Sequence, residues 1–216
     1  MKSRKAFKKF TNARCGRWLL ALLLISSSPL AFGQYVLSID GNDVDVTVGE
    51  KQTVTLTNGE TVTLLLKKKA ILTYDSHFFS FQYKSEFSPS KSDLGSGINQ
   101  MLMATAQGTV VMAQEYTSLD PSSLVDTMIQ AMTKDEVNAG YTLDETPIEK
   151  KLADGKVLKG KIATTTHKDD QWIRTVVAYG DGDEGVLFVT QISKSNISAE
   201  QPVLDMFWNT LALKGF

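Results

Sequence analysis

The chain is poor in the residue types that most often build metal centres and nucleophilic sites. Its 216 residues include one cysteine, Cys15, and two histidines, His77 and His167. A zinc centre draws on several cysteine and histidine ligands, and these histidines have no metal-ligand spacing to each other or to a cysteine. The sequence therefore argues against zinc. Once Cys15 is removed with the N-terminal segment described below, no disulfide and no thiol nucleophile remain.

Motifs for nucleotide binding and nucleophilic catalysis are also missing. The stretch Gly95-Ser96-Gly97 lacks the Gly-x-Ser-x-Gly spacing of a hydrolase elbow. The sequence contains no phosphate-cradling glycine loop and no dinucleotide fingerprint. The acidic turn at residues 180–185 lacks the ligand spacing of an EF-hand, so we interpret it as a solvated loop rather than a calcium site. We therefore expect a protein that is not an enzyme and needs no cofactor.

The chain has no apolar run long enough to span a bilayer, and its most apolar run lies in a segment with the layout of an export signal. Residues 1–33 contain seven Lys and Arg residues and no acidic residue, then an apolar run at 18–25, then Ala31-Phe32-Gly33. That run is far shorter than the ~20 residues that span a bilayer. A basic start, a short apolar middle and a small-residue end predict a cleaved secretory signal peptide, and hence a periplasmic protein. A retained membrane anchor is the alternative.

Positive charge is scarce after residue 33. Seven of the 23 Lys and Arg residues but none of the 24 Asp and Glu residues precede that point, so the remainder carries a net charge of about −8. A chain with this balance is poorly suited to binding nucleic acid or anionic lipid through bulk charge. We expect neither as a partner.

Residues 34–74 are predicted to form a small β-hairpin unit. Apolar and polar residues alternate there with many β-branched side chains, which is typical of strands. Asn58-Gly59 lies between two such runs and predicts a tight type I′ turn. Lys67, Lys68 and Lys69 follow, and we interpret them as a solvated strand edge, with a partner-docking patch as the alternative.

Residues 75–216 are predicted to form an α+β domain. Phe79, Phe81 and Tyr83 share one face of a strand, which favours a core role over a ring-lined ligand face. Asp120 and Pro121 predict the start of a helix. The other expected elements are strands at 98–105, 109–116, 147–152, 156–166, 171–179 and 185–192, and a helix beginning at Ser198. One antiparallel sheet packed by helices would bury all their apolar stripes.

This order of elements resembles the PsbP/DcrB/Mog superfamily over residues 75–216. The similarity rests on the aromatic strand FFSFQY, a pair of strands, a helix, a four-strand meander and a terminal amphipathic helix ending in LALKGF. The resemblance implies an α/β/α sandwich. It also implies a binding, assembly or accessory protein with no shared catalytic site.

Two functional hypotheses follow. The first is a non-enzymatic periplasmic accessory protein that binds a protein partner or an envelope assembly. The second is a small-molecule or copper-binding protein, or an enzyme, with a pocket between sheet and helix near Trp172 and Tyr179. Trp172 and Arg174 lie on one strand face and suggest a partly exposed pair that binds a ligand, with simple surface stacking of the two side chains as the alternative. Five methionines raise the copper question, although core filling accounts for them more simply: Met101, Met103, Met112, Met128 and Met132.

Overall fold

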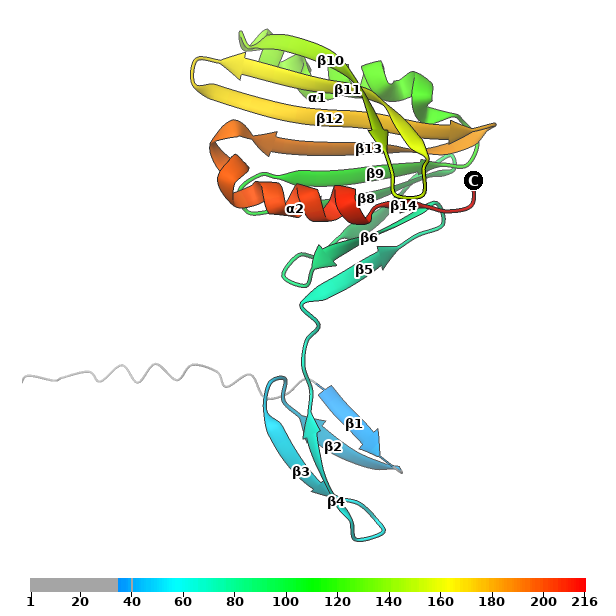
Figure 1. Ribbon diagram of the computed structural model, residues 1–216, viewed down its shortest axis with the longest axis vertical. Helices are drawn as coiled ribbons and strands as arrows, with labels where there is room; N and C mark the ends of the chain where they lie inside the picture. Colours follow the sequence, from blue (N-terminus) through cyan, green and yellow to red (C-terminus); the bar gives the residue numbers. More distant parts are fainter. Residues whose placement is uncertain (1–34, 40) are drawn as a thin grey trace, which may run out of the picture. The chain divides into compact units, whose positions relative to one another are not determined.

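The computed structural model describes residues 35–39 and 41–216 (Figure 1). The chain divides into two compact units, Met1–Leu66 and Lys67–Phe216. We call them the N-terminal and the C-terminal unit and describe each by itself. None of the helices in the described part of the chain is long and apolar enough to cross a membrane.

The N-terminal unit consists of two antiparallel hairpins. β1 (Tyr35–Ile39) pairs with β2 (Asn42–Val46), and β3 (Lys51–Thr55) pairs with β4 (Thr61–Leu65). The predicted type I′ turn at Asn58-Gly59 is wrong, because only Gly59 has a positive φ, of 86°. The Asn58 side chain instead accepts the Glu60 N–H at 2.9 Å, which builds a wider loop around an Asx turn.

The C-terminal unit is built on a seven-stranded antiparallel sheet in the order β10-β11-β12-β13-β9-β8-β7. Central β13 is buried on both faces, which accounts for its nearly unbroken apolar run from Val186 to Val189. β7 was not expected from the sequence. The strands are β7 (Ser90–Gly95), β8 (Ile98–Ala104), β9 (Val110–Tyr116), β10 (Thr142–Lys151), β11 (Val157–His167), β12 (Asp170–Asp181) and β13 (Glu184–Ser193).

A second, three-stranded sheet has the order β14-β6-β5. It joins β5 (Ile71–Asp75) and β6 (Phe79–Lys84) to the short C-terminal strand β14 (Ala212–Leu213). Because β5 pairs with β6, it belongs to the C-terminal unit. The division therefore falls between Leu66 and Lys67, earlier than the boundary after residue 74 drawn from the sequence.

The two helices cover opposite faces of the large sheet. A 3-10 turn (Pro121–Leu124) leads into α1 (Val125–Asn138), and a second 3-10 turn (Lys194–Asn196) leads into α2 (Ile197–Thr210). On β12, Val176 packs in the core under α1, whereas Val177 packs in the core with α2. Successive strand residues point to opposite faces, so the sheet is covered on both sides. The protein is thus an α+β fold of mostly antiparallel sheets with two helices.

The aromatic stretch at 77–87 forms part of the core on the α2 face. Phe78, Phe79 and Phe81 are each 1% exposed. Phe79 meets Phe188 of β13 edge-on at 5.2 Å, and Phe81 meets Phe207 of α2 at 5.0 Å between ring centroids. The core interpretation is confirmed for Phe79 and Phe81, and Tyr83 packs half-buried against the same core. Burying each such side chain stabilises the fold by about 1.5–3 kcal/mol.

The start of the first helix depends on a glycine from a distant strand. Asp120 caps the turn, because its Oδ1 accepts the Ser122 N–H at 2.8 Å. A Cβ atom at Gly180 of β12 would overlap that carboxylate. Gly180 therefore allows the cap to pack directly against the sheet, and it fixes where α1 begins.

Candidate functional site

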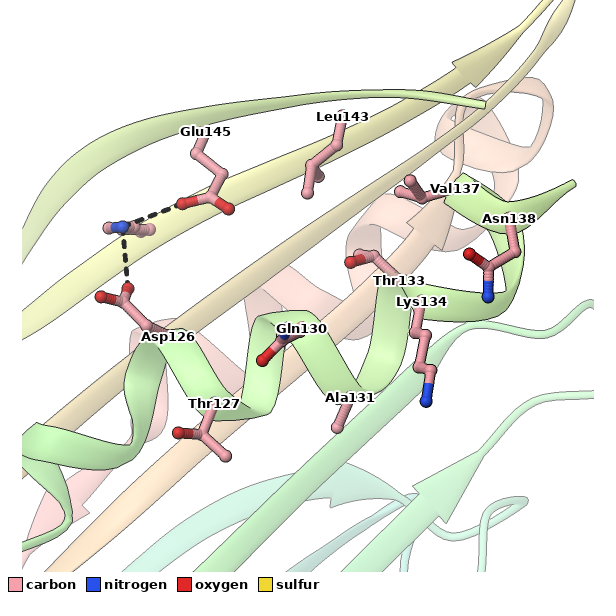
Figure 2. A pocket seen from close by; sticks show the side chains of 11 residues that line it. Asp126, Thr127, Gln130, Ala131, Thr133, Lys134, Val137, Asn138, Leu143 and Glu145 are labelled. Atoms are coloured by element: carbon pink, nitrogen blue, oxygen red, sulfur yellow. Dashed lines mark hydrogen bonds and ion pairs between the residues drawn. The ribbon is translucent and has the colours of Figure 1, made fainter. Parts of the chain in front are cut away.

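A groove of about 940 Å³ lies between α1 and strands β10 and β11 (Figure 2). We call it the α1 groove. Its lining is mixed, with carboxylates, amides, hydroxyls, two lysines and a few apolar side chains. The residues are Asp126, Thr127, Gln130, Ala131, Thr133, Lys134, Val137, Asn138, Leu143, Glu145 and Lys161.

One lysine bridges the two walls of this groove. Lys161 Nζ on β11 lies 2.7 Å from Asp126 Oδ1 on α1 and 2.9 Å from Glu145 Oε2 on β10 (Figure 2). The hydrogen bonds to Asp126 and Glu145 raise the pKa of Lys161 to about 12. The ammonium therefore stays charged at physiological pH and holds the start of α1 beside the edge strand.

The opposite end of the groove is apolar. Val137 of α1 is 43% exposed and Leu143 of β10 is 37% exposed. In Figure 2 both lie at the end of the groove away from the Lys161 bridge. Together they form an apolar surface at that end of the groove.

A buried ion pair anchors α1 to the sheet beneath the groove. Arg174 of β12 is 3% exposed, and its guanidinium binds the Glu136 carboxylate through both terminal nitrogens, at 2.5 and 2.9 Å. Its Nε donates to Gln191 Oε1 at 2.8 Å, and Nη1 also donates to Thr165 Oγ1 at 3.0 Å. A bidentate pair with this much support fixes both position and orientation.

A second contact ties the end of α1 to the sheet. Tyr141, between α1 and β10, donates its hydroxyl to Asp170 Oδ2 at 2.5 Å. That hydrogen bond, with smaller contributions from desolvation and the nearby carboxylates, raises the pKa of Tyr141. The Tyr141 ring also lies 5.2 Å from the His167 ring. These two contacts fix the C-terminal part of α1 against the sheet.

Most of the charged groups of the groove are paired with one another. Its carboxylates at Asp126 and Glu145 are both engaged by one lysine. Both histidines lie elsewhere, His77 against Phe78 and His167 against Tyr141. Across residues 35–39 and 41–216, no group of three or more His, Cys, Asp or Glu side chains is placed to hold a metal ion. What the arrangement offers chemically is hydrogen bonding, charge and apolar contact.

The expected partly exposed Trp172–Arg174 pair is wrong for Arg174, because that guanidinium is buried and binds Glu136. The Trp172 ring lies against Gly108. Trp172 and Tyr179 do not line one pocket either. They are seven residues apart on β12 and so point to opposite faces, Tyr179 toward the core on the α2 side.

The lysine triplet does not form a strand edge. Lys67, Lys68 and Lys69 lie in the exposed link between β4 and β5, outside any strand. Lys68 Nζ donates to the backbone oxygen of Ser85 at 2.5 Å, which holds this link to the end of β6.

The residues that build the groove were not singled out from the sequence. A signal existed for one contact. Asp154-Gly155 is a sequence typical of a tight turn. Counting outward from this turn along the two strands places Lys161 opposite Pro147 and diagonal to Glu145. No local pattern links Asp126 or Glu136 to the sheet, because helix placement depends on tertiary packing.

A smaller pocket of about 240 Å³ lies between α2 and the sheet. Lys150 of β10 reaches over the Trp208 ring, 4.5 Å from its centroid, and burial lowers the pKa of this lysine. Gln201 donates to Asp205 Oδ1 at 2.9 Å on the helix side. The remaining lining residues are Ile173, Thr175, Thr190, Ile192, Ile197, Leu204 and Asn209.

The N-terminal unit carries an apolar hollow of about 280 Å³. Tyr35 and Val36 at its rim are 56% and 60% exposed. Its other lining residues are Leu37, Val46, Leu64, Leu65 and Leu66.

The methionines fill the two cores. Met101 and Met103 are buried on the α2 face. Three others pack around the core under α1: Met112, Met128 and Met132. The sheet therefore separates the two groups, and the core-filling interpretation is confirmed.

Comparisons with known proteins identify no family. No family model matches the chain, and no curated protein matches it. A crystal structure of a protein from Bacteroides thetaiotaomicron VPI-5482, determined at 1.50 Å resolution, aligns with a TM-score of 0.34 and 12% identity. The alignment covers 66% of this chain and 48% of that one, so this chain spans about half of that protein. A likeness at that score carries no argument about fold family or function.

Proposed function

We propose that the protein is a non-enzymatic accessory protein of the periplasm that binds a segment of a protein partner in the α1 groove. The observation that carries the proposal is the groove itself, about 940 Å³ in volume, with Val137 and Leu143 exposed at one end. Its walls are held together by the Lys161 bridge at one end and by the Arg174–Glu136 pair, which does not line the groove, so the site is formed before a ligand binds. Pre-formed sites of this kind lower the entropic cost of binding.

The mixed lining favours a polypeptide over a small metabolite. Amides and hydroxyls at Thr127, Gln130 and Asn138 match backbone groups, and the apolar end matches an aliphatic side chain. Protein interfaces combine apolar contacts with a polar rim in this way. Small-molecule pockets bury most of their ligand, whereas this groove lies open beside an edge strand.

Export and a PsbP/DcrB/Mog-like sandwich are part of the same proposal. Residues 1–33, which lie outside the described residues, have the layout of a cleaved signal peptide. The two-sided covering of an antiparallel sheet by α1 and α2 supports the sandwich. Both features are typical of accessory proteins that work in envelope assemblies.

Site-specific photocrosslinking tests the proposal with a matched pair of alanines. Ala131 is exposed and lines the α1 groove, whereas Ala153 is exposed in the turn between β10 and β11. A photoreactive amino acid replaces one or the other in the full chain expressed in its native envelope. We expect a discrete protein adduct from position 131 that is absent from position 153.

A second substitution separates groove binding from chance proximity. Val137→Asp should abolish the adduct from position 131, because it places a charge at the apolar end of the groove. Equal adducts from both alanines, or an adduct that survives Val137→Asp, would count against the groove as the partner site. Export is tested separately by the N-terminal residue of the mature protein.

The sheet–α2 pocket supports a second candidate function, binding of a small molecule. Lys150 and Trp208 place a cation and an aromatic ring at one 240 Å³ pocket, which offers charge to an anionic group and a flat apolar surface to a ring. Ligand-dependent shifts of the melting temperature that disappear in Trp208→Leu would support it. Shifts that persist in that variant would place the ligand elsewhere.

A further inference from the structure

The outer edge of the large sheet lies directly beside the α1 groove. β10 forms that edge and pairs only with β11 among the described strands. Its residues from Thr142 to Pro147 are all exposed, so none of the described segments covers them. An uncovered edge strand presents unpaired backbone N–H and C=O groups.

The register shows which backbone groups of β10 face outward. Leu152, just past the strand, donates its N–H to Lys156 O at 2.8 Å across the hairpin. The backbone N–H and C=O groups of even-numbered β10 residues therefore point toward β11. Pro147 has no N–H to donate, and it lies in the odd-numbered set opposite Lys161. Hydrogen-bonded and non-hydrogen-bonded pairs alternate in an antiparallel ladder. Leu143 and Glu145 therefore direct both backbone groups away from the sheet.

Pro147 divides this edge into two parts. Proline protects an edge because a neighbouring strand finds no donor there. The part before it, residues 142–146, keeps its outward donors at Leu143 and Glu145. The side chains of these same two residues line the α1 groove (Figure 2). The open edge and the groove thus share residues.

We propose that an extended segment of the protein partner adds to β10 as an extra strand over residues 142–146, with alternate side chains entering the α1 groove. This inference rests on the proposed function and names its binding mode. Strand addition gains affinity from main-chain hydrogen bonds and selectivity from alternate side chains.

Charge defines the chemistry of that segment. The Asp144 side chain lies on the sheet face opposite the groove and forms no ion pair among the described residues. A cross-strand cation beside it is favourable. On the groove side, Leu143 and Val137 favour an apolar residue. The partner segment therefore alternates aliphatic and basic side chains, which also suits the net charge of about −8 after residue 33.

A short capped peptide that alternates valine and lysine serves as the probe, with a valine–glutamate peptide of the same length as its control. Glu145→Pro removes the outward N–H, whereas the matched Glu145→Ala keeps it and loses the same side chain. We expect Glu145→Pro to weaken binding of the valine–lysine peptide by roughly tenfold or more, the equivalent of one lost hydrogen bond in a desolvated interface. Both variants lose the carboxylate that lines the groove and binds Lys161, so the decisive comparison is between them: Glu145→Pro should bind this peptide roughly tenfold more weakly than Glu145→Ala.

Two further measurements keep the test decisive. Asp144→Lys should reverse the preference between the two peptides. In the wild-type chain, the valine–lysine peptide should slow hydrogen exchange at the Leu143 and Glu145 amides. Exchange at the Asp144 amide should not change, because that N–H already points toward β11. That readout stands even where Glu145→Pro proves unstable.

Equal binding by the proline and alanine variants, unchanged exchange at both amides, or no binding by the wild type would overturn strand addition. The crosslinking result at Ala131 is independent of all three. A groove adduct together with any of these outcomes would keep the proposed function and reject this binding mode.

Discussion

Removing Glu136 should destabilise the C-terminal unit more than removing Arg174, although the two form one ion pair. The asymmetry follows from burial. The Arg174 side chain is 4% exposed, whereas the Glu136 side chain is 24% exposed. Loss of the carboxylate leaves a buried guanidinium with only Gln191 and Thr165 as partners. Loss of the guanidinium leaves a carboxylate that already reaches water.

The magnitudes follow from these two situations. Breaking a buried pair so that one charge remains uncompensated costs about 3–5 kcal/mol, so we expect this range for Glu136→Ala. Arg174→Met leaves the Glu136 carboxylate without its cation, but that carboxylate is partly solvated. The methionine side chain also fills the space of the arginine stem. For this variant we expect about 1–3 kcal/mol, the usual cost of an unsatisfied polar group.

Urea unfolding of both variants measures these costs through the midpoint at unchanged slope. For a unit of this size, Glu136→Ala should also lower the melting temperature by about 6–20 °C. The double variant Glu136→Leu with Arg174→Met should recover part of the loss, because apolar replacement of a buried pair is often neutral or stabilising. Equal costs below about 1 kcal/mol for both single variants would refute the reasoning.

Further substitutions probe the fold on both sides of the large sheet, at Phe81 in the core on the α2 face and at Gly180 and Lys161 on the side of α1. Phe81→Ala should cost about 3–5 kcal/mol in urea unfolding, because it empties space between β6 and α2. Gly180→Ala should lower the unfolding midpoint, since its Cβ overlaps the Asp120 cap, and Asp120→Ala in the same background should recover part of that loss. The pKa of Lys161 is raised to about 12, so its charged form stabilises the folded state. This stabilisation is complete at pH values below the ordinary lysine pKa of ~10.4 and is lost as pH rises through about 12. The difference in urea midpoint between wild type and Lys161→Met should therefore be constant up to about pH 10 and shrink above it.

The class of fold was predictable because its signals are local. Alternation along the strands, the Asp120-Pro121 helix start and the turns of the meander each follow from a few neighbouring residues. The helix expected at Ser198 begins one residue earlier, at Ile197. β10 begins at Thr142, five residues before the start expected at Pro147. The run from Thr142 to Thr146 carries only one apolar residue, so it lacks the apolar–polar alternation that predicts a strand.

The site was less predictable because its contacts join distant parts of the chain. Arg174 and Glu136 are 38 residues apart and meet only once α1 packs on β12. From the sequence, an arginine beside Trp172 on a strand reads as a surface pair. Its burial depends on the helix that covers it, and strand alternation alone does not say which face a helix will cover.

The same packing explains why binding should concentrate at one edge of the sheet. Cores fill both of its faces, under α1 on one side and under α2 with the second sheet on the other. A partner that bound a face would have to displace one of these layers and lose its buried area. At the opposite edge, β7 has a register irregularity between Asp93 and Gly95, and such bulges discourage further pairing. The first half of β10 is regular, exposed and free of proline, and it adjoins the α1 groove. Recognition at that edge therefore leaves both cores intact and uses the 940 Å³ α1 groove beside it.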